Sequence, residues 1–546
     1  MPFPPITVAP SAYTYPLLIK QLLHTALATA PEQEIVYKDA RRHTYVEFHH
    51  RLKRLANTLT TLGVQPGSTV AVMDWDSHRY LEAFFGIPMM GATLMMVNVR
   101  LSPEQIAYTL NHSGATVLLA NQEFLPILDG IRPQLANIKT VILMSDETTP
   151  AAGAFAGEYE SLLASASDQF DFPEFDENTR ATTFYTTGTT GAPKGVYFSH
   201  RQLVLHTLGV GNTLAMGHNQ GRIHREDVYM PLTPMFHVHA WGMPYIATLS
   251  GMKQVYPGRY HAETILKLID REKVSFTHCV PTVLNMLLND PYSPNVDLSN
   301  FKVIIGGSAL TTSLTRAAMA RGVDVFSGYG MSETCPIMAL SYVSTDDLAA
   351  ADEKQVMLRA KTGRPVALVD LRAVDAQMQS VPRDGKTAGE IVVRAPWLTQ
   401  GYLNNPTASE DLWRGGWLHT QDIGHFDAQG YLQVTDRIKD VIKSGGEWIS
   451  SLELEEMINS HPGVSEVAVI GVRDEKWGER PLALVVLRPE FVDKVTTADI
   501  TAHVRAYSDR GLISPFAVPE NIMFIESLNR TSVGKLDKVS MRKQHV

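Results

Sequence analysis

A loop rich in threonine and glycine, residues 184–195 with the sequence FYTTGTTGAPKG, has the composition of a polyphosphate-binding site. Hydroxyls and closely approaching backbone amides would bind an anion, and Lys194 adds a fixed positive charge. The spacing differs from a Walker loop, because Gly195 stands where a serine or threonine would hold Mg²⁺. A flexible connection without function is the alternative. The residues expected to contact phosphate are Thr186, Thr187, Gly188, Thr189, Thr190, Gly191 and Lys194.

Four later stretches carry polar groups that suit a nucleotide. In SGYGMSET (327–334), Tyr329 offers an aromatic plate, and Glu333 offers a carboxylate of the kind that Mg²⁺ prefers beside substrate phosphates. In WLHTQDIG (417–424), the carboxylate of Asp422 suits two ribose hydroxyls. The stretches DRIKDVIKSGGEW and NRTSVGKLDK add the cations Arg437, Lys439, Lys443 and Lys535.

Composition restricts the class of protein. The chain has 546 residues, of which 44% are hydrophobic and 19% charged, as in an ordinary globular protein with more than one domain. A net charge of −9 argues against a general nucleic-acid binder. Two cysteines make a disulfide framework or a thiolate metal site unexpected, and they fit a reducing cytoplasm. We see no secretory signal, and the apolar stretch 81–99 is interrupted by glycine and proline, so it is expected to be buried core.

The order of apolar segments predicts the fold. Up to about residue 180, short apolar strands such as 68–75 alternate with segments of helical periodicity such as 44–63. This alternation predicts a doubly wound, mainly parallel α/β sheet. It resumes beyond the loop, and each polar motif there follows an apolar strand, at the sheet edge where ligands bind. The run from about 146 to 180 is expected to be a surface connection.

The pattern of predicted strands and helices changes twice along the sequence. From about residue 355, shorter strands with glycine-centred turns predict a smaller β subdomain. From about residue 438, a helix, two strands and a helix predict a compact α+β unit. We therefore expect an N-terminal domain, residues 1–437, that holds the nucleotide and acid sites, and a C-terminal domain, residues 438–546.

Taken together, the motifs resemble those of the adenylate-forming superfamily: acyl-CoA synthetases, firefly luciferase and peptide-synthetase adenylation domains. Six motifs occur in the same order, and the resemblance covers nearly the whole chain. MFHVHAWGMPY and DRIKDVIKSGGEWISSLELE look most like medium- and long-chain fatty-acyl-CoA synthetases. The resemblance implies stacked doubly wound sheets with a β subdomain, followed by a small mobile α+β domain.

The resemblance also implies two half-reactions. A carboxylate attacks the α-phosphorus of ATP, giving an acyl-adenylate and pyrophosphate, and the thiol of coenzyme A then displaces AMP. A carboxylate is a poor nucleophile toward a polyanion, so the enzyme must neutralise charge and align the reactants. The implied ligands are a carboxylic acid, ATP, Mg²⁺ and coenzyme A, without nucleic acid or a transmembrane segment. A homodimer is plausible by resemblance alone.

Roles carry over by resemblance to individual residues. Thr186 to Lys194 would cradle the β- and γ-phosphates, with Thr186 and Glu333 on Mg²⁺. Asp422 would hold the ribose, assisted by Arg437. The adenine and α-phosphate site would be lined by Gly307, Ser327, Gly328, Tyr329 and Ser332.

Lys535 would reach the carboxylate and the α-phosphate during adenylation. We expect its loss to cripple the first half-reaction and to spare thioester formation from supplied acyl-adenylate. Separate assays of the two half-reactions test this expectation, and an equal loss in both would remove the role.

Lys439 would be the hinge about which the C-terminal domain turns, because a few residues at an element boundary can absorb a large backbone change. Rotation would exchange Lys535 for the face with Gly445, Gly446 and Trp448. Trp448 could stack on the adenine of a nucleotide or simply pack on the surface. Lys443 looks like a nucleotide contact, with a solvated lysine as the alternative.

The acid would lie beside His237, although a core histidine is the competing interpretation. Trp241 resembles the gate of a fatty-acid tunnel, with core packing as the alternative. Gly306 and Gly307 leave room for a chain. His239 and Cys335 are expected to be packing residues.

Some positions depart from the family's pattern. Ser327 stands where many members have glutamine or glutamate, which puts an adenine contact there in doubt. Gln421 replaces a common glycine beside Asp422 and so changes the backbone freedom. Asn529 stands where proline is common.

Two other functions stay open at this stage. A ligase for aryl or arylalkanoic acids would need a short closed slot instead of a channel. An adenylation module that loads a carrier protein is disfavoured, since no carrier domain follows residue 546 in this sequence and Trp448 beside two glycines favours free coenzyme A.

Overall fold

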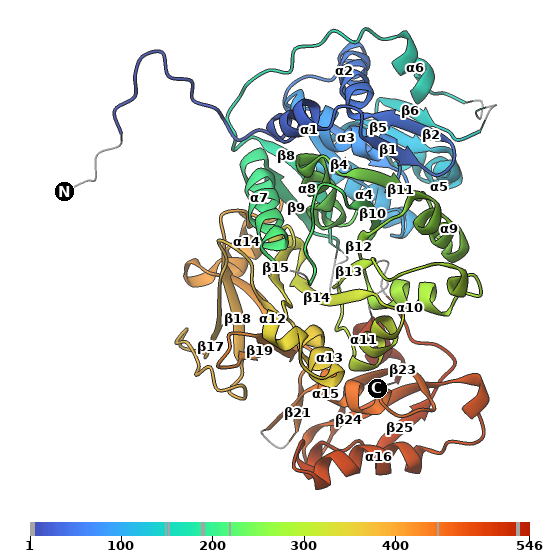
Figure 1. Ribbon diagram of the computed structural model, residues 1–546, viewed down its shortest axis with the longest axis vertical. Coiled ribbons are helices and arrows are strands. Elements are labelled where there is room, and N and C mark those ends of the chain that lie inside the picture. Colours follow the sequence, from blue (N-terminus) through green and yellow to red (C-terminus); the bar gives the residue numbers. More distant parts are fainter. Residues whose placement is uncertain are drawn as a thin grey trace.

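The computed structural model describes residues 6–147, 150, 153–186, 192–217, 220–444, 447–530 and 536–545, without the side chains of Glu447 and Trp448. Two large sheets form the upper part of the molecule in Figure 1, a four-stranded sheet lies below them, and the C-terminal unit lies at the bottom. The predicted fold class, α/β with a β subdomain and a small α+β unit, is confirmed.

The first large sheet has seven strands in the order β7-β6-β5-β3-β4-β8-β9, and all neighbours are parallel except β8 and β9. Its strands are β3 (Thr69–Met73), β4 (Thr93–Met96), β5 (Ala115–Asn121), β6 (Thr140–Met144), β7 (Gly157–Glu158), β8 (Arg180–Tyr185) and β9 (Gly195–Ser199). The helices along this part of the chain are α3 (His78–Met89), α4 (Pro103–Ser113), α5 (Leu125–Ile131), α6 (Tyr159–Ser165) and α7 (His200–Met216).

The second large sheet has nine strands in the order β16-β15-β14-β13-β12-β10-β11-β1-β2. Its strands are β1 (Glu34–Tyr37), β2 (Arg41–Thr44), β10 (Val228–Leu232), β11 (Lys253–Tyr256), β12 (Phe276–Cys279), β13 (Lys302–Ile305), β14 (Asp324–Gly330), β15 (Ile337–Leu340) and β16 (Arg364–Pro365). Its helices are α1 (Leu23–Thr29), α2 (Tyr45–Thr61), α8 (Met243–Ser250), α9 (Ala262–Glu272), α10 (Pro281–Asn289), α11 (Thr312–Ala320), α12 (Thr345–Leu348) and α13 (Asp352–Ala360).

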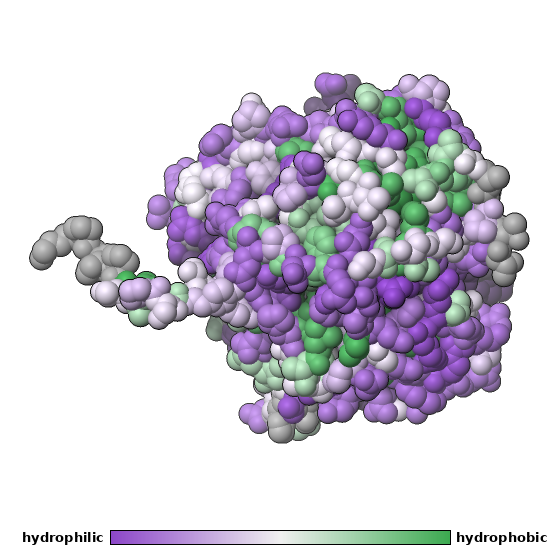
Figure 2. Space-filling view, turned by 90° about the horizontal axis from the view of Figure 1, so that it is seen from above, coloured by the Kyte–Doolittle hydropathy of each residue, from purple (hydrophilic) through white to green (hydrophobic). Residues whose placement is uncertain are grey.

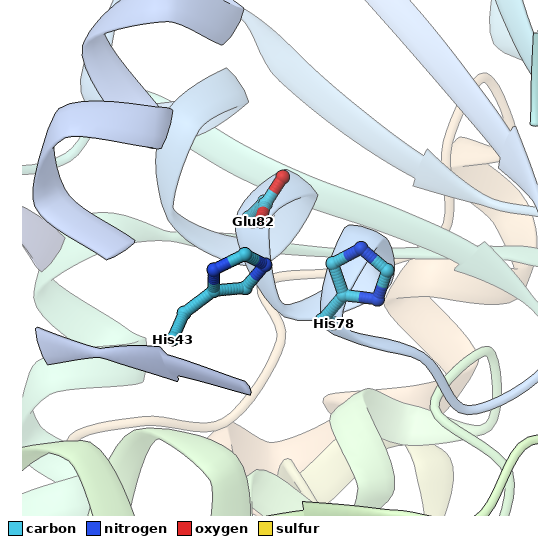
Figure 3. A group of neighbouring side chains, drawn as sticks. All are labelled: His43, His78 and Glu82. Carbon is cyan, nitrogen blue, oxygen red and sulfur yellow. The ribbon is translucent and has the colours of Figure 1, made fainter. Parts of the chain in front are cut away.

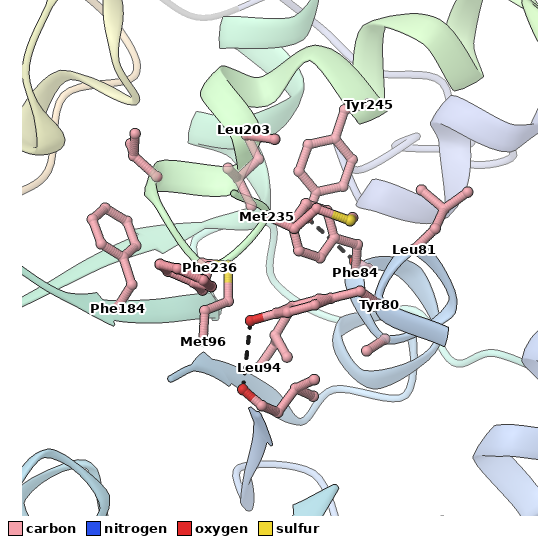
Figure 4. Packing of buried hydrophobic residues seen from close by; sticks show 14 of the residues in the cluster. Tyr80, Leu81, Phe84, Leu94, Met96, Phe184, Leu203, Met235, Phe236 and Tyr245 are labelled. Carbon is pink, nitrogen blue, oxygen red and sulfur yellow. Dashed lines mark hydrogen bonds between the residues drawn. The ribbon is translucent and has the colours of Figure 1, made fainter. Parts of the chain in front are cut away.

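Local sequence explains where several helices begin. Thr44, Ser102 and Ser199 each cap a helix, and a glutamate or glutamine three residues later completes a capping box. Every residue of α3 is buried, as expected for the apolar stretch 81–99. Figure 4 shows Tyr80 and Phe84 of α3 packed with Tyr245 of α8 and with Met235 and Phe236, which follow β10. One apolar core therefore joins elements of both large sheets.

The remaining chain forms two smaller sheets. The four-stranded antiparallel sheet contains β17 (Asp370–Val374), β18 (Gly389–Arg394), β19 (Leu418–Phe426) and β20 (Leu432–Arg437), with α14 (Pro406–Leu412) between β18 and β19. The C-terminal unit contains β21 (Ile442–Ser444), β22 (Glu447–Ile449), β23 (Val464–Asp474), β24 (Gly478–Leu487) and β25 (Asn521–Phe524), with α15 (Ser451–Asn459), α16 (Thr497–Asp509) and α17 (Lys538–His545). The domain boundary at residues 437 and 438, between β20 and β21, stays a prediction.

The N-terminal segment projects from the body of the protein in Figure 2. Ile6, Val8 and Tyr13 lie on it and are exposed. In the described part of the chain, no helix combines the length and the apolar character needed to cross a membrane.

The prediction of a surface connection from about 146 to 180 was wrong for its middle part, which forms β7 and α6. Tyr159 is fully buried, and its hydroxyl donates to Glu82 at 2.6 Å. Glu160 accepts hydrogen bonds from Arg51. The error arose because the partners of these residues come from α2 and α3, more than seventy positions earlier in the chain.

His43, His78 and Glu82 form a group whose residue types could hold a metal ion (Figure 3). However, Arg51 donates to Glu82 at 2.6 Å and to Glu160 at 2.9 Å. Burial would raise the pKa of Glu82, but Arg51 more than offsets this, and the pKa lies below its ordinary value. The guanidinium thus supplies the positive charge that the buried carboxylates need, and we interpret the group as a structural ion-pair network.

Arg51→Met should destabilise the N-terminal domain by about 3–5 kcal/mol, because it leaves the carboxylate of Glu82 buried without its cation. Thermal and urea unfolding of the purified protein measure this loss. Arg132→Met is the matched control: Arg132 pairs with Asp129 at the surface, so its loss should cost below about 1 kcal/mol. Equal effects of both substitutions would contradict a structural role for the network.

Candidate active site

The threonine-rich loop is the turn between β8 and β9. The N–H of Thr186 donates to the carbonyl of Lys194 at 3.0 Å, which closes the base of the turn. Gly195 then accepts a hydrogen bond from the N–H of Leu403 at 2.8 Å, so residues after β18 run beside the loop. The ammonium of Lys194 lies 4.7 Å from the centre of the Tyr402 ring. This places the only charge of the loop against an aromatic face.

Tyr402 also connects the loop to Glu333, which follows β14. Its hydroxyl donates to Oε1 of Glu333 at 2.7 Å, and the carbonyl of Glu333 accepts the N–H of Thr399 at 3.0 Å. Burial raises the pKa of Glu333 above its ordinary value, while Tyr402, Lys194 and Arg437 act to lower it. The carboxylate is therefore buried among positive groups, at a point where a further cation would stabilise its ionised form.

Asp422 lies in β19, directly opposite Arg437 in β20. Its Oδ2 accepts the hydroxyl of Tyr329 at 2.6 Å, and its Oδ1 lies 3.3 Å from Nε of Arg437. Asp422 and Glu333 both act on the pKa of Arg437 and raise it above the ordinary value against the cost of burial. Arg437 thus links Asp422 to Glu333, and Tyr329, also predicted to contact the nucleotide, lies beside Asp422.

The neighbouring residue carries backbone strain. Gln421 has φ of +60°, in the left-handed region that favours glycine. The departure from the common glycine that we noted beside Asp422 is therefore accommodated with strain at this position. The carbonyl of Gln421 accepts the N–H of Ile438 at 2.9 Å, a contact that ties this strand to the segment leading into the C-terminal unit.

Two cavities meet beside the nucleotide residues. His237, Trp241 and Gly307 line both of them. The first is also bordered by Gly306, Gly328, Tyr329, Met331, Ser332 and Ile337, and the second by Arg100, Leu232, Thr233, Tyr260, Val280 and Val283. The first has a volume of about 380 Å³ and the second of about 400 Å³, and both values include the solvent-filled space at the opening. The second cavity has largely apolar walls, which suit an apolar part of a substrate, whereas the walls of the first are both polar and apolar.

Trp241 is one of the residues that line both cavities. It packs on His278, with ring centres 4.9 Å apart, and only 5% of the residue is exposed. A side chain at Gly306 would come within 2.9 Å of the indole, so this close approach requires glycine. Trp241 is thus both packed in the core and placed at the cavity, which combines the two alternatives that the sequence left open.

The turn that carries Trp241 is left-handed. Residues 238–242 have φ angles of +42°, +60°, +46°, +56° and +73°, and only the last is glycine. Each non-glycine residue in this region costs roughly 1–2 kcal/mol, so the surrounding structure must enforce the turn. His239 contributes to this, because it is buried and bonded to Thr182 at 2.7 Å, in keeping with its expected structural role.

Not every predicted site residue lies in this place. Ser327 is buried in β14, and its hydroxyl donates to the carbonyl of Ala360 at 3.5 Å; it does not line either of the two cavities. Cys335 is fully buried, as expected of a packing residue. Lys443 is exposed on β21, paired with Trp448 of β22, and Lys439 lies between β20 and β21.

The roles of several predicted residues stay predictions, because these residues lie outside the part that the structure describes: Thr187, Gly188, Thr189, Thr190, Gly191, Gly445, Gly446 and Lys535, together with the side chain of Trp448.

Sequence reasoning missed Tyr402, although it contacts both Lys194 and Glu333. A signal was present: the segment TQGYLNNP combines turn-forming residues with one aromatic hydroxyl shortly after an apolar strand. Nothing in that segment, however, indicates that it runs antiparallel to Val196 at the base of the phosphate loop.

Tyr402→Phe should lower kcat/KM for adenylation roughly tenfold to a hundredfold, because Glu333 loses a hydrogen bond to its charged form. The same hydrogen bond lowers the pKa of Glu333, so its removal should move the acid limb of the pH–rate profile to higher pH. Pyrophosphate release measured across pH tests both effects. Tyr431→Phe is the control, since its hydroxyl donates to Tyr342 instead; identical profiles for the two variants would refute the role.

Two family models match the chain. The AMP-binding enzyme model matches residues 23–403, and the AMP-binding enzyme C-terminal domain model matches residues 453–535. A long-chain-fatty-acid–CoA ligase of Thermus thermophilus is 40% identical over 530 residues, which cover 96% of this chain and 94% of that protein. A 3-methylmercaptopropionyl-CoA ligase of Ruegeria pomeroyi is 38% identical, with 90% of each chain covered.

Solved structures show the same fold. The anthranilate CoA ligase AuaEII in complex with anthranoyl-AMP superposes with a TM-score of 0.85 at 25% identity, over 97% of this chain and 98% of that chain. The first family model alone spans more than half of this sequence, and four of the predicted residues, Tyr329, Glu333, Asp422 and Arg437, are linked in the structure by a hydrogen bond and by charge. The chain therefore belongs to the AMP-binding enzyme family, that is, to the adenylate-forming superfamily, close to its fatty-acyl-CoA synthetases.

Proposed function

We propose that this enzyme is a fatty acid–CoA ligase for medium or long chains, which forms an acyl-adenylate and then a thioester with coenzyme A. The relatives support the general activity, which is ATP-dependent ligation of a carboxylic acid to coenzyme A. Our proposal adds that the acid is a fatty acid of medium or long chain. One observation carries it: Trp241 lines two neighbouring cavities, and the one that also includes Val280 and Val283 has largely apolar walls. Rotation of the indole would join the two cavities into one channel for an extended chain.

The residues of the site account for the first half-reaction as charge neutralisation and alignment. Lys194 and Arg437 supply fixed positive charge around Glu333. Asp422, held by Tyr329 and Arg437, presents a rigid acceptor for ribose hydroxyls. Lys535, by resemblance, would add the cation at the α-phosphate and the attacking carboxylate. No protein nucleophile is needed, because the acid itself attacks phosphorus.

A magnesium ion fits the donor set of the site. Glu333 offers a buried carboxylate whose ionised form lacks full compensation, and Thr186 offers a hydroxyl at the base of the phosphate loop. Both are hard oxygen donors, which Mg²⁺ prefers together with phosphate oxygens. When bound, the ion would neutralise phosphate charge. Within this chain, Glu333 and Thr186 would hold it, and Tyr402 would orient Glu333.

An aryl acid is the second candidate. The cavity beside Tyr329 is also lined by Trp241 and Gly306, and its walls are both polar and apolar. Such a lining suits a substituted aromatic ring better than a long alkyl chain. The relative AuaEII, which is named for anthranilate, is consistent with this alternative.

A panel of acids from acetate to palmitate, with benzoate and cinnamate, should separate the candidates. We expect kcat/KM for coenzyme A-dependent pyrophosphate release to rise with chain length, by roughly a few-fold for each added methylene. Benzoate should be a poor substrate. A maximum at benzoate or cinnamate would instead establish the aryl alternative.

Trp241→Ala tests the cavity argument within the same panel. Removal of the indole should join the cavities and shift the preference toward longer chains, with KM for ATP unchanged within about twofold. Trp397→Phe, in the core outside the cavity walls, serves as the control for a lost buried indole. An unchanged chain-length profile in Trp241→Ala would count against the channel.

A further inference from the structure

Asp76 is a buried carboxylate to which the reaction above gives no role. It follows β3 and is only 2% exposed. Its Oδ1 accepts the N–H of Met235 at 2.8 Å, and its Oδ2 accepts the hydroxyl of Tyr260. Its backbone carbonyl accepts the N–H of Gly258 at 2.8 Å. Asp76, which follows a strand of the seven-stranded sheet, thus accepts three hydrogen bonds from segments that follow strands of the nine-stranded sheet.

These contacts join two special places in the topology. In the seven-stranded sheet, the chain leaves β3 toward β4 on one side and leaves β5 toward β6 on the other, so the strand order reverses between β3 and β5. In the nine-stranded sheet it reverses in the same way between β10 and β12. Crevices at the carboxyl ends of such strands are where ligands bind in open α/β sheets. Asp76 follows β3, whereas Met235 and Tyr260 follow β10 and β11.

Met235 begins the segment that carries the acid site. The left-handed turn 238–242 starts three residues later, and His237 lies between. Figure 4 shows the side chains of Met235 and Phe236 in the apolar core, so the segment is anchored there from one side. On the other side, the Met235 amide is bound by Asp76. A strained turn persists only where its surroundings over-determine it, and this hydrogen bond is one such restraint.

Tyr260 extends the connection to the cavity. It donates to Asp76 and, together with His237 and Trp241, lines the cavity that also contains Val280 and Val283. The carboxylate therefore restrains two walls of one cavity, one through a backbone amide and the other through a phenol.

We propose that Asp76 is a positioning residue for the acid site, which sets the place of His237 and Trp241 by clamping the two sheets together at residues 235 and 260. The proposal rests on the function proposed above, because it takes this cavity to receive the acid. Asp76 does not touch the reacting atoms.

The test compares Asp76→Ala, Asp76→Asn and Tyr260→Phe, with Asp74→Ala as the matched control. Asp74 is equally buried near the end of β3, but it accepts hydrogen bonds from Trp75, Ser77 and Asn121 and has none with residues 235–260. The substrate is whichever acid of the panel is activated best. KM for the acid, KM for ATP and kcat are measured by pyrophosphate release.

Asp76→Ala should raise KM for the acid about tenfold and leave KM for ATP within about twofold. Asp76→Asn keeps an acceptor for the Met235 amide and should restore most of the loss. Tyr260→Phe should give an intermediate effect. If Asp76→Ala does not fold, Asp76→Asn and Tyr260→Phe decide. The proposal is overturned if Tyr260→Phe matches the wild type, or if Asp76→Ala raises KM for the acid no more than Asp74→Ala does.

A second measurement does not need turnover. Acrylamide quenching of tryptophan fluorescence is compared between each variant and its Trp241→Phe derivative, so that the difference reports on Trp241. The clamp predicts that Trp241 becomes more accessible in Asp76→Ala and not in Asp74→Ala; equal accessibility would refute it. If no acid is activated at all, the proposed function fails, while quenching still tests the clamp.

Discussion

Three buried carboxylates, each bonded to a tyrosine hydroxyl, organise this protein's central region. Tyr402 donates to Glu333, Tyr329 to Asp422, and Tyr260 to Asp76. A carboxylate removed from water is costly unless hydrogen bonds and positive charge compensate it. The phenols provide the hydrogen bonds here, and Lys194 and Arg437 provide charge for Glu333. The compensation fixes each carboxylate in one orientation.

The same requirement explains why the site draws on several parts of the chain. The phosphate loop is the turn between β8 and β9 of the first large sheet, and Glu333 follows β14 of the second. Tyr402 lies beyond β18, and Asp422 is in β19 of the small antiparallel sheet. No single element supplies a carboxylate together with its donor and its cation. The proposed nucleotide site therefore needs the two large sheets and the β subdomain to pack together.

The acid side depends on shape more than on charge. A left-handed turn places the Trp241 indole against His278, in space that only glycine at position 306 leaves open. Four consecutive non-glycine residues in this conformation need support from the apolar core and from the clamp at Asp76. Because the strain is local and Trp241 lines both cavities, a modest change at this turn can alter the space available to the acid.

Much of this could be predicted from the sequence because the signals are local. Hydrophobic periodicity, caps such as Thr44 and Ser102, and the order of strands and helices depend on neighbouring residues, and the structure has these elements near the predicted positions. The types and spacing of Tyr329, Glu333, Asp422 and Arg437 also predicted a nucleotide site, and the structure brings these residues together, while their roles stay predictions. The segment 157–165 was misassigned because Tyr159 is buried by residues of α2 and α3, which its own neighbours cannot indicate.

The sequence by itself determined the classes of element and the chemical inventory of the site. Only the tertiary structure decided that Tyr402 bridges Lys194 and Glu333, that residues 238–242 turn left-handed, and that Asp76 binds Met235 and Tyr260. The reason is physical: these features are enforced by hydrogen bonds and packing between segments that are between about seventy and two hundred positions apart, and such contacts leave no periodic trace in the chain.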